Sequence, residues 1–456
     1  MVKRSAVSVI ALFTAAACAA GSLDQGDSGS AQAQSSSASA SQPVTDAAGD
    51  PIPEMAVYEV TDTSAYSAED EAGYLARFNK LMEDARVGAG LDSYDPLEPV
   101  AGATGAALLP KTDDPSLSKA GLESAHDYVA ARNTSAFIVW KDGAIQHEAY
   151  FGDFDAKTPI VSKSLAKPIT ALLIGRALME GHIQSLDQPV ADFITEWKGD
   201  PAREKIKIRY LLDMRTGLLP QGFSPKPEDM LNRAYLHPRH DEVIINDYPV
   251  THVAGERYEY SNANAELVAP LIERATGKRY GDYVSEALLK PIGAMGGSVW
   301  VNREGGTAHS GCCILLPAQS WVRMAMLIMK DGVWEGERLL PEGYVEAMRT
   351  GTPENPYYGM GVWVAGPYIE RRGFAHPDIP YGKVEHSQPY LDKDLFLFDG
   401  NSNQVVYMIP SQNMIVLRTG ARPPKEAPWD NTIVPNILIR DAVAVAGTAL
   451  PEPQPQ

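Results

Sequence analysis

Apolar runs at the two ends of one long stretch of chain constrain the fold most strongly. The runs 136–140 and 144–150 flank a short turn that contains Asp142 and Gly143. Apolar runs joined across Asp-Gly are typical of a β-hairpin. Three further runs of this kind lie much later in the chain, at 395–398, 405–409 and 414–418. Strands this far apart predict one antiparallel sheet that both ends of a domain build together.

The chain between these strands has mostly helical patterns. Apolar spacing predicts helices at 171–179, 190–197, 210–214 and 263–276, with further helices at 116–132, 321–330 and 435–445. The expected fold class is α+β, an α/β sandwich in which helices flank the antiparallel β-sheet and a mostly helical insertion separates its strands. We assign residues 116–450 to this domain. Residues 55–115, with one helical pattern at 74–82, form an N-terminal extension packed on it.

The first 18 residues have the pattern of an export signal. Lys3 and Arg4 precede an apolar stretch, 6–17, that is too short to span a membrane. Cys18 follows three alanines, which resembles the lipobox of bacterial lipoproteins, although Ala15 stands where leucine is usual. We therefore predict a signal peptide at 1–18 whose lipobox cysteine, Cys18, is lipidated. The alternative is an ordinary signal peptide that is cut nearby, with Cys18 lost.

Composition and charge indicate the surroundings of the protein. Residues 19–54 are small and polar, which predicts a disordered linker. Together with the signal, this predicts export to the bacterial cell envelope, in a periplasmic, lipid-anchored form. The net charge of -18, with no basic cluster, argues against nucleic acid and anionic membrane surfaces as partners. The lipid anchor is the only membrane contact that we expect.

Cysteines and histidines give weaker signals. Cys312 and Cys313 are adjacent and cannot link distant parts of a fold, so we interpret them as two small buried residues in a turn, with a vicinal disulfide as the alternative. We interpret His309-Ser310-Gly311 as a surface turn rather than part of a substrate cleft. The pair His237 and His240 contains a proline and matches no metal-binding motif.

The segment Ser164-Leu165-Ala166-Lys167 is the first candidate for catalysis. Residues three apart share one face of a helix, so the amine of Lys167 would lie beside the hydroxyl of Ser164. An apolar run follows at 169–174, and a lysine on a buried helix can lose its proton and act as a base. A helix N-cap at Ser164 is the alternative. The same spacing recurs at Ser116 and Lys119, where we interpret Ser116 as an N-cap.

A second signal is Tyr260-Ser261-Asn262. A tyrosine hydroxyl beside a lysine can relay or accept the proton of a serine, and an asparagine amide can hold both the lysine and a substrate carbonyl. The alternative is a buried tyrosine followed by an asparagine that caps the helix at Ala263. Neither motif is specific alone.

In combination, these motifs resemble the serine hydrolases of the class C β-lactamase and penicillin-binding protein family. That family includes DD-carboxypeptidases, esterases and 6-aminohexanoate-dimer hydrolases. The resemblance covers roughly 116 to 445 and extends to four other stretches: 185–190, 206–218, Gly255-Glu256-Arg257, and 399–404. It implies a β-lactamase/transpeptidase-like fold.

The resemblance also implies roles for individual residues. Ser164 attacks a carbonyl, Lys167 takes part in proton transfer, and Tyr260 is the base for acylation and the acid toward the leaving group. Whether Lys167 or Tyr260 is the first base stays open. Backbone amides of Ser164 and Asn401 form the oxyanion hole, and Asn262 contacts substrate. No metal or organic cofactor is implied.

The third motif of that family departs from its pattern. Lys-Thr-Gly or His-x-Gly in relatives aligns with Phe398-Asp399-Gly400. The relatives' cation recognises a substrate carboxylate, whereas Phe398 cannot and Asp399 would repel one. Gly400 keeps the small residue that close approach to substrate requires. We predict that the substrate is a small-molecule ester or amide. Like Asn262, Asp399 and Gly400 are predicted to contact this substrate. The alternatives are a true β-lactamase or DD-carboxypeptidase, or a non-catalytic protein that binds cell-wall peptides.

Overall fold

The computed structural model describes residues 2–7, 55–87, 93–220, 226–376 and 383–455. Cys18 and the predicted linker at 19–54 lie outside the described residues, so their assignments stay predictions. Residues 2–7 form strand β1 (Val2–Val7), antiparallel to β2 (Met55–Val60). Among the described residues, none of the helices combines the length and the apolar character that crossing a bilayer requires.

The main sheet is antiparallel and has six strands in the order β11-β14-β15-β16-β4-β5. Its members are β4 (Thr134–Lys141), β5 (Ala144–Tyr150), β11 (Trp363–Val364), β14 (Phe396–Gly400), β15 (Gln404–Ile409) and β16 (Met414–Gly420). Asp142 and Gly143 both have positive φ, as a tight hairpin turn needs. Val416 of β16 pairs with Val139 of β4, which joins the late strands to the early hairpin. The predicted fold class is confirmed.

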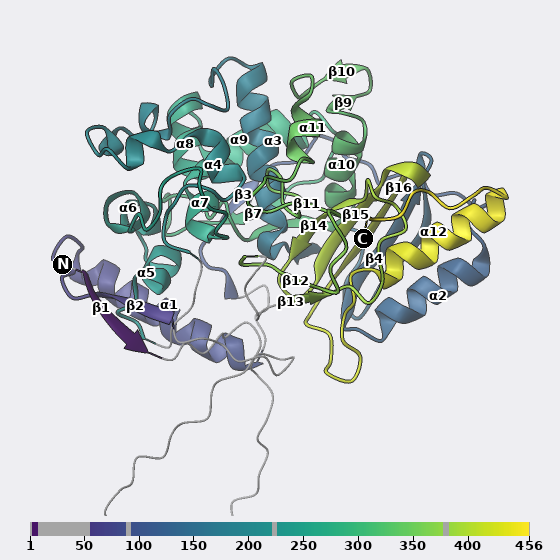
Figure 1. Ribbon diagram of the computed structural model, residues 1–456, viewed down its shortest axis with the longest axis horizontal. Coiled ribbons are helices and arrows are strands. Elements are labelled where there is room, and N and C mark those ends of the chain that lie inside the picture. Colours follow the sequence, from purple (N-terminus) through teal and green to yellow (C-terminus); the bar gives the residue numbers. More distant parts are fainter. Residues whose placement is uncertain (1, 8–54, 88–92, 221–225, 377–382, 456) are drawn as a thin grey trace, which may run out of the picture.

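Side chains on the two faces of this sheet pack into different cores. Phe137 and Val139 face a cluster that includes Leu438, whereas Ile138 and Trp140 face the larger cluster. Helices α2 (Lys119–Ala130) and α12 (Ile433–Ala446) cover the first face, where Figure 1 shows them side by side. Helix α10 (Ala318–Met329) covers the other face, and α3 (Ala166–Met179) is buried in the same core.

The insertion between β5 and β11 is mostly helical. Besides α3 and α10, its α-helices are α4 (Ile208–Leu212), α5 (Met230–Leu236), α6 (His240–Glu242), α7 (Asn262–Glu266), α8 (Val268–Thr276), α9 (Tyr280–Tyr283) and α11 (Tyr344–Met348). The helix predicted at 190–197 is wrong. Two 3-10 turns, η3 (Val190–Asp192) and η4 (Thr195–Trp197), stand there, and the N–H of Val190 donates to Ile206 O.

A second sheet, which the sequence did not predict, brings the candidate site together. It has the order β3-β7-β8-β6, with β3 (Leu97–Val100), β6 (Pro159–Val161), β7 (Gly297–Trp300) and β8 (Ile314–Pro317). Strand β6 leads into the segment of Ser164, and β8 follows the turn after His309. The extension supplies β3 and a helix, α1 (Ala68–Val87), so it shares a sheet with the main domain.

Two short strand pairs complete the described strands. The small strands are β9 (Val333–Trp334), β10 (Glu337–Arg338), β12 (Arg371–Gly373) and β13 (Lys383–Glu385).

The N-cap predicted at Ser116 is wrong, because Ser118 caps α2 by accepting from Gly121 N. The hydroxyl of Ser116 bonds instead to Gln146 Oε1 at 3.2 Å.

Candidate active site

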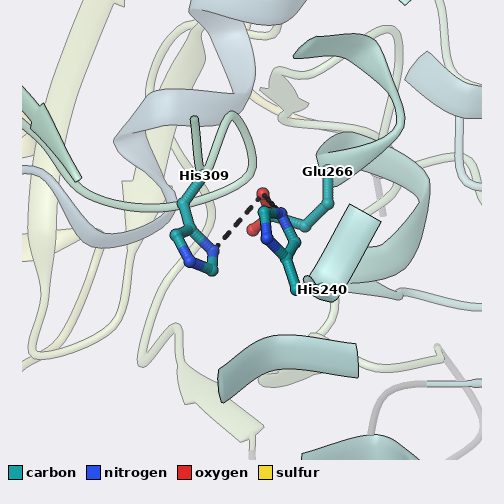
Figure 2. Close-up of side chains that lie close together, drawn as sticks. All are labelled: His240, Glu266 and His309. Carbon is teal, nitrogen blue, oxygen red and sulfur yellow. Dashed lines mark ion pairs between the residues drawn. The ribbon is translucent and has the colours of Figure 1, made fainter. Parts of the chain in front are cut away.

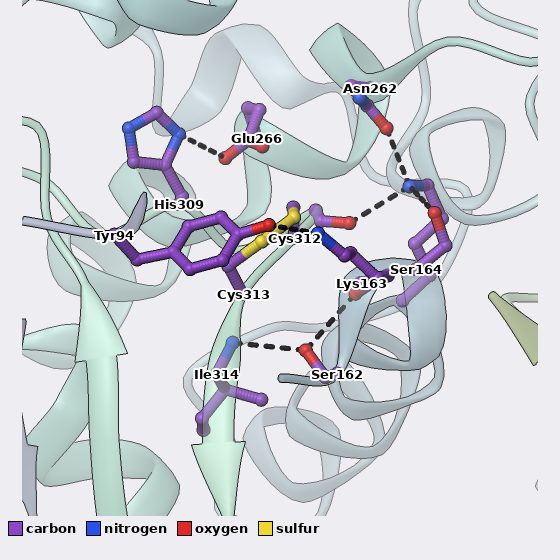
Figure 3. The surroundings of a disulfide bond; sticks show 12 residues. Tyr94, Ser162, Lys163, Ser164, Asn262, Glu266, His309, Cys312, Cys313 and Ile314 are labelled. Atoms are coloured by element: carbon purple, nitrogen blue, oxygen red, sulfur yellow. Dashed lines mark hydrogen bonds and ion pairs between the residues drawn. A yellow bond between two sulfur atoms is a disulfide. The ribbon is translucent and has the colours of Figure 1, made fainter. Parts of the chain in front are cut away.

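Ser164 lies in a short 3-10 turn, η2 (Lys163–Leu165), that leads directly into α3. Lys163 has a φ of 51°, a left-handed conformation that is uncommon for a residue with a side chain. Ser162 anchors this turn: its hydroxyl donates to Lys163 O and accepts from Ile314 N of β8, both at 3.1 Å (Figure 3). The second sheet therefore sets the position of the candidate nucleophile.

The amine of Lys167 is buried and lies within hydrogen-bond distance of three neutral groups. These are Ser164 Oγ at 3.1 Å, Asn262 Oδ1 at 2.7 Å and Gly311 O at 2.9 Å. The side chain is only 2% exposed. The acceptors come from η2, from the start of α7 and from the turn before β8, so three separate segments meet at one lysine. This geometry allows a proton to move between Ser164 Oγ and Lys167 Nζ.

Tyr260 lies against the same lysine, in an aromatic setting. Lys167 Nζ is 4.8 Å from the centroid of its ring. The ring stacks on Trp363 at 6.3 Å and meets the edge of Phe374 at 5.6 Å. Its backbone N–H donates to Ala375 O at 3.0 Å. The structure thus brings Ser164, Lys167, Asn262 and Tyr260 together, while their roles remain predictions.

The end of strand β14 packs against η2, where Gly400 permits a close approach. A Cβ atom added at Gly400 would lie 3.0 Å from Leu165 Cδ1 and 3.1 Å from Ser162 O. Asn401 begins the turn that follows this glycine. Phe398 is fully buried in the larger core cluster and presents nothing to a substrate.

The carboxylate of Asp399 is paired inside the protein, which differs from the role facing substrate that we predicted. It accepts from Arg372 Nη2 at 2.6 Å and from Asn431 Nδ2 at 3.0 Å. Burial raises the pKa of Asp399, and the Arg372 guanidinium opposes that shift. Arg372 also lies over the ring of Trp363, with its Cζ atom 4.1 Å from the centroid. Sequence reasoning missed Arg372 because no motif marks it.

His309 is buried rather than on a surface turn, so that prediction is wrong. It is 1% exposed and lies beside His240 and Glu266, which are also buried (Figure 2). Glu266 Oε2 is 3.6 Å from His240 Nε2 and 3.7 Å from His309 Nδ1. These three side chains are the group among the described residues that could hold a metal ion. No sequence motif indicated this cluster, because its three residues come from separate segments of the chain.

Cys312 and Cys313 form a disulfide, so the prediction of two unlinked cysteines is wrong. Both are buried, and Cys313 has a φ of 69°. Figure 3 shows the disulfide between His309 and the segment of Ser164. The pair directly follows Gly311, whose carbonyl holds Lys167, and directly precedes β8. The turn therefore brings the two sulfur atoms together within the wall of the site.

The extension also reaches the site, which the sequence did not indicate. Lys163 Nζ donates to the hydroxyl of Tyr94, and the same amine is 4.9 Å from the centroid of that ring. Tyr94 packs on Trp300 at 5.5 Å. A residue next to the candidate nucleophile is thus held by the segment that precedes the main domain.

Sequence comparisons found one family model and several curated proteins that resemble parts of this chain. The model of the family described as Beta-lactamase matches residues 124–311. The 6-aminohexanoate-dimer hydrolase of Paenarthrobacter ureafaciens is 25% identical over 232 residues, which are 48% of this chain and 57% of that relative. The chain therefore matches little more than half the length of this relative.

Two solved structures share the fold. A putative 6-aminohexanoate-dimer hydrolase from Bacillus anthracis has a TM-score of 0.59 at 19% identity, and covers 78% of this chain and 93% of its own. A putative beta-lactamase from Bacteroides dorei has a TM-score of 0.55 at 18% identity, and covers 70% of this chain and 96% of its own. At these identities the likeness shows the fold alone.

We predict that Tyr260→Phe lowers kcat for ester hydrolysis by about 10²- to 10⁴-fold, the usual contribution of a positioned acid–base group. The ring packing stays, so the melting temperature should hardly change. Tyr358→Phe is the matched control, because the buried Tyr358 hydroxyl has no hydrogen-bond partner within the described part of the chain. Steady-state kinetics and thermal denaturation of both variants check this. A Tyr260→Phe variant with the parent's kcat would contradict the role.

Proposed function

We propose that this chain, whose residues 124–311 match the model of the family described as Beta-lactamase, is a serine hydrolase that cleaves an ester or amide through an acyl-enzyme. One observation carries the proposal: the buried Lys167 amine lies 3.1 Å from Ser164 Oγ, with Tyr260 against it. A nucleophile beside a positioned base is the arrangement that covalent catalysis requires.

In the proposed reaction, Ser164 Oγ attacks the substrate carbonyl carbon as its proton passes to the Lys167 and Tyr260 pair. The carbonyl oxygen takes the negative charge, which backbone N–H groups of Ser164 and Asn401 stabilise. The tetrahedral intermediate collapses when the carbon–leaving group bond breaks and Tyr260 returns the proton to the departing oxygen or nitrogen. Water then repeats the sequence on the ester of Ser164, which releases the acid and restores the hydroxyl.

The charges around the site favour a substrate without a carboxylate beside the scissile bond. Phe398 is buried in the core and supplies no cation. Arg372 is 2% exposed and already bonded to Asp399, so its charge is balanced within the protein. A substrate carboxylate would therefore lose its water without gaining an ionic partner from either position. This disfavours penicillins and D-Ala-D-Ala peptides. Intact Ser164, Lys167 and Tyr260 disfavour a purely binding role.

Ser164→Ala should abolish covalent labelling by a fluorophosphonate probe, because the probe reacts with an activated serine oxygen. Ser116→Ala is the matched control: Ser116 has the same spacing to a lysine, yet its hydroxyl is bonded to Gln146. Gel fluorescence of labelled protein reads out both variants. Labelling that survives in Ser164→Ala would sink the assignment of the nucleophile.

A pair of p-nitrophenyl esters that differ only by a carboxylate next to the scissile bond tests the substrate class. The neutral ester should have the higher kcat/KM, by roughly tenfold or more, since one charged hydrogen bond contributes about 1.5–3 kcal/mol. Nitrocefin turnover and D-alanine release serve as the comparison reactions. Either reaction running as efficiently as the neutral ester would favour a β-lactamase or DD-carboxypeptidase instead.

We also propose that the protein is exported to the cell envelope and lipidated at Cys18. The supporting observation is the short apolar stretch at 6–17 that precedes this cysteine. In a bacterial host, Cys18→Ser should lose incorporation of an alkyne fatty acid and leave the membrane fraction, because lipid chains supply the anchor. Ala15→Leu is a control that should keep or increase labelling. Equal labelling of Cys18→Ser and the parent chain would refute lipidation at this residue.

A further inference from the structure

We propose that His240, Glu266 and His309 bind one divalent transition-metal ion, with Zn²⁺ as the best match, behind the candidate catalytic lysine. The side chains come from α6, from the end of α7 and from the turn before β8 (Figure 2). One ligand atom from each residue lies within 4.8 Å of the others. Two imidazoles and one carboxylate are a common ligand set for zinc.

The distances within this cluster fit ligands around an ion better than a hydrogen-bonded triad. Glu266 Oε2 is 3.6 Å from His240 Nε2 and 3.7 Å from His309 Nδ1, beyond the reach of normal hydrogen bonds. Two ligand atoms that each lie about 2.0–2.1 Å from a tetrahedral Zn²⁺ are roughly 3.4 Å apart. Both gaps are therefore close to the spacing of two ligand atoms around one ion.

Every polar side-chain atom of the three residues is buried and has no hydrogen-bond partner among the described residues. The six atoms are Nδ1 and Nε2 of His240, Nδ1 and Nε2 of His309, and Oε1 and Oε2 of Glu266. Buried polar groups are almost always bonded, since leaving one unpaired costs about 1–3 kcal/mol. An ion would engage one atom of each residue at once, and water on the fourth position of the ion could engage others.

The surroundings of the Glu266 carboxylate also suit a cation. Among the described residues, no lysine or arginine forms an ion pair with Glu266. A divalent ion between the three side chains would place a positive charge beside this buried carboxylate.

Ring stacking indicates which side chain moves when the ion binds. His309 stacks between Trp300, at 3.6 Å, and His240, at 4.0 Å. An imidazole coordinates through a lone pair in its own plane, so two parallel rings cannot share one ion as they stand. Because His309 has an aromatic neighbour on both faces, we assign the rotation about Cβ–Cγ to His240.

The proposed ion would fix the acceptors of Lys167. Glu266 ends the helix that Asn262 begins, and a Cβ added at Gly311 would lie 3.0 Å from Glu266 Oε1. Asn262 and Gly311 supply two of the three acceptors of Lys167. The ion would join their two segments, so its role is structural and it does not touch the substrate. The inference does not depend on the proposed hydrolase activity.

Metal content of the purified full-length chain tests the site without any activity assay. After incubation with Zn²⁺ and removal of excess, elemental analysis should find about one equivalent per chain. Glu266→Gln and His309→Gln should each weaken Zn²⁺ binding by more than about 100-fold. Loss of a residue that only hydrogen-bonds to a metal ligand already costs about 10- to 100-fold in metal affinity. His182→Gln is the matched control, a half-exposed histidine elsewhere, and should retain one equivalent. Ser164→Ala should also retain it.

A second measurement keeps the test decisive where a variant fails to fold. The parent chain, stripped by a chelator, should melt at a lower temperature and regain its melting temperature with Zn²⁺. Substitution by Co²⁺ should give the visible absorption of a tetrahedral ion, which Glu266→Gln or His309→Gln would lose. A parent chain that holds no stoichiometric metal and shows no thermal shift with Zn²⁺ or Co²⁺ would overturn the proposal. The cluster would then be a buried histidine–glutamate network that holds a proton.

Discussion

The rest of the structure is arranged around one buried lysine amine. Lys167 is 2% exposed, and a polar group out of water is costly unless it is hydrogen-bonded. Its three acceptors belong to the turn of Ser164, to the start of α7 and to the turn at Gly311. These segments are separated by about 95 and 144 residues in sequence. The fold that satisfies this lysine therefore also assembles the candidate site.

Two sheets give that assembly its precision. The six-stranded sheet places Gly400 against η2, where an added Cβ atom would lie only 3.0 Å from Leu165 Cδ1 and 3.1 Å from Ser162 O. The second sheet binds η2 from another side through Ser162 and β8. Ser164 is thus held between two independent hydrogen-bonded frameworks rather than on a free loop. Such support is what a nucleophile needs to keep productive geometry.

The partners of the charged and polar side chains in the site were harder to predict from the sequence than the fold was. Phe398 suggested that the site lacks a cation for a substrate carboxylate, and its burial agrees with that. Asp399 looked like a repulsive charge, yet it pairs with Arg372, 27 residues away. His309 looked like part of a surface turn, yet it packs between Trp300 and His240. For Asp399 and His309 the partners lie on other elements, and local sequence patterns carry no information about such partners.

The sequence by itself determined the hairpin at 136–150, the late strands, the helix of Lys167 and the pairing of a serine with a lysine. These features depend on apolar periodicity, turn residues and a spacing of three, all of which act over a few neighbouring residues. Only the tertiary structure decided the second sheet, the replacement of a helix at 190–197 by a pairing with Ile206, the disulfide at Cys312 and the His240, Glu266 and His309 cluster. These depend on contacts between distant segments, which exist only when the cores have formed.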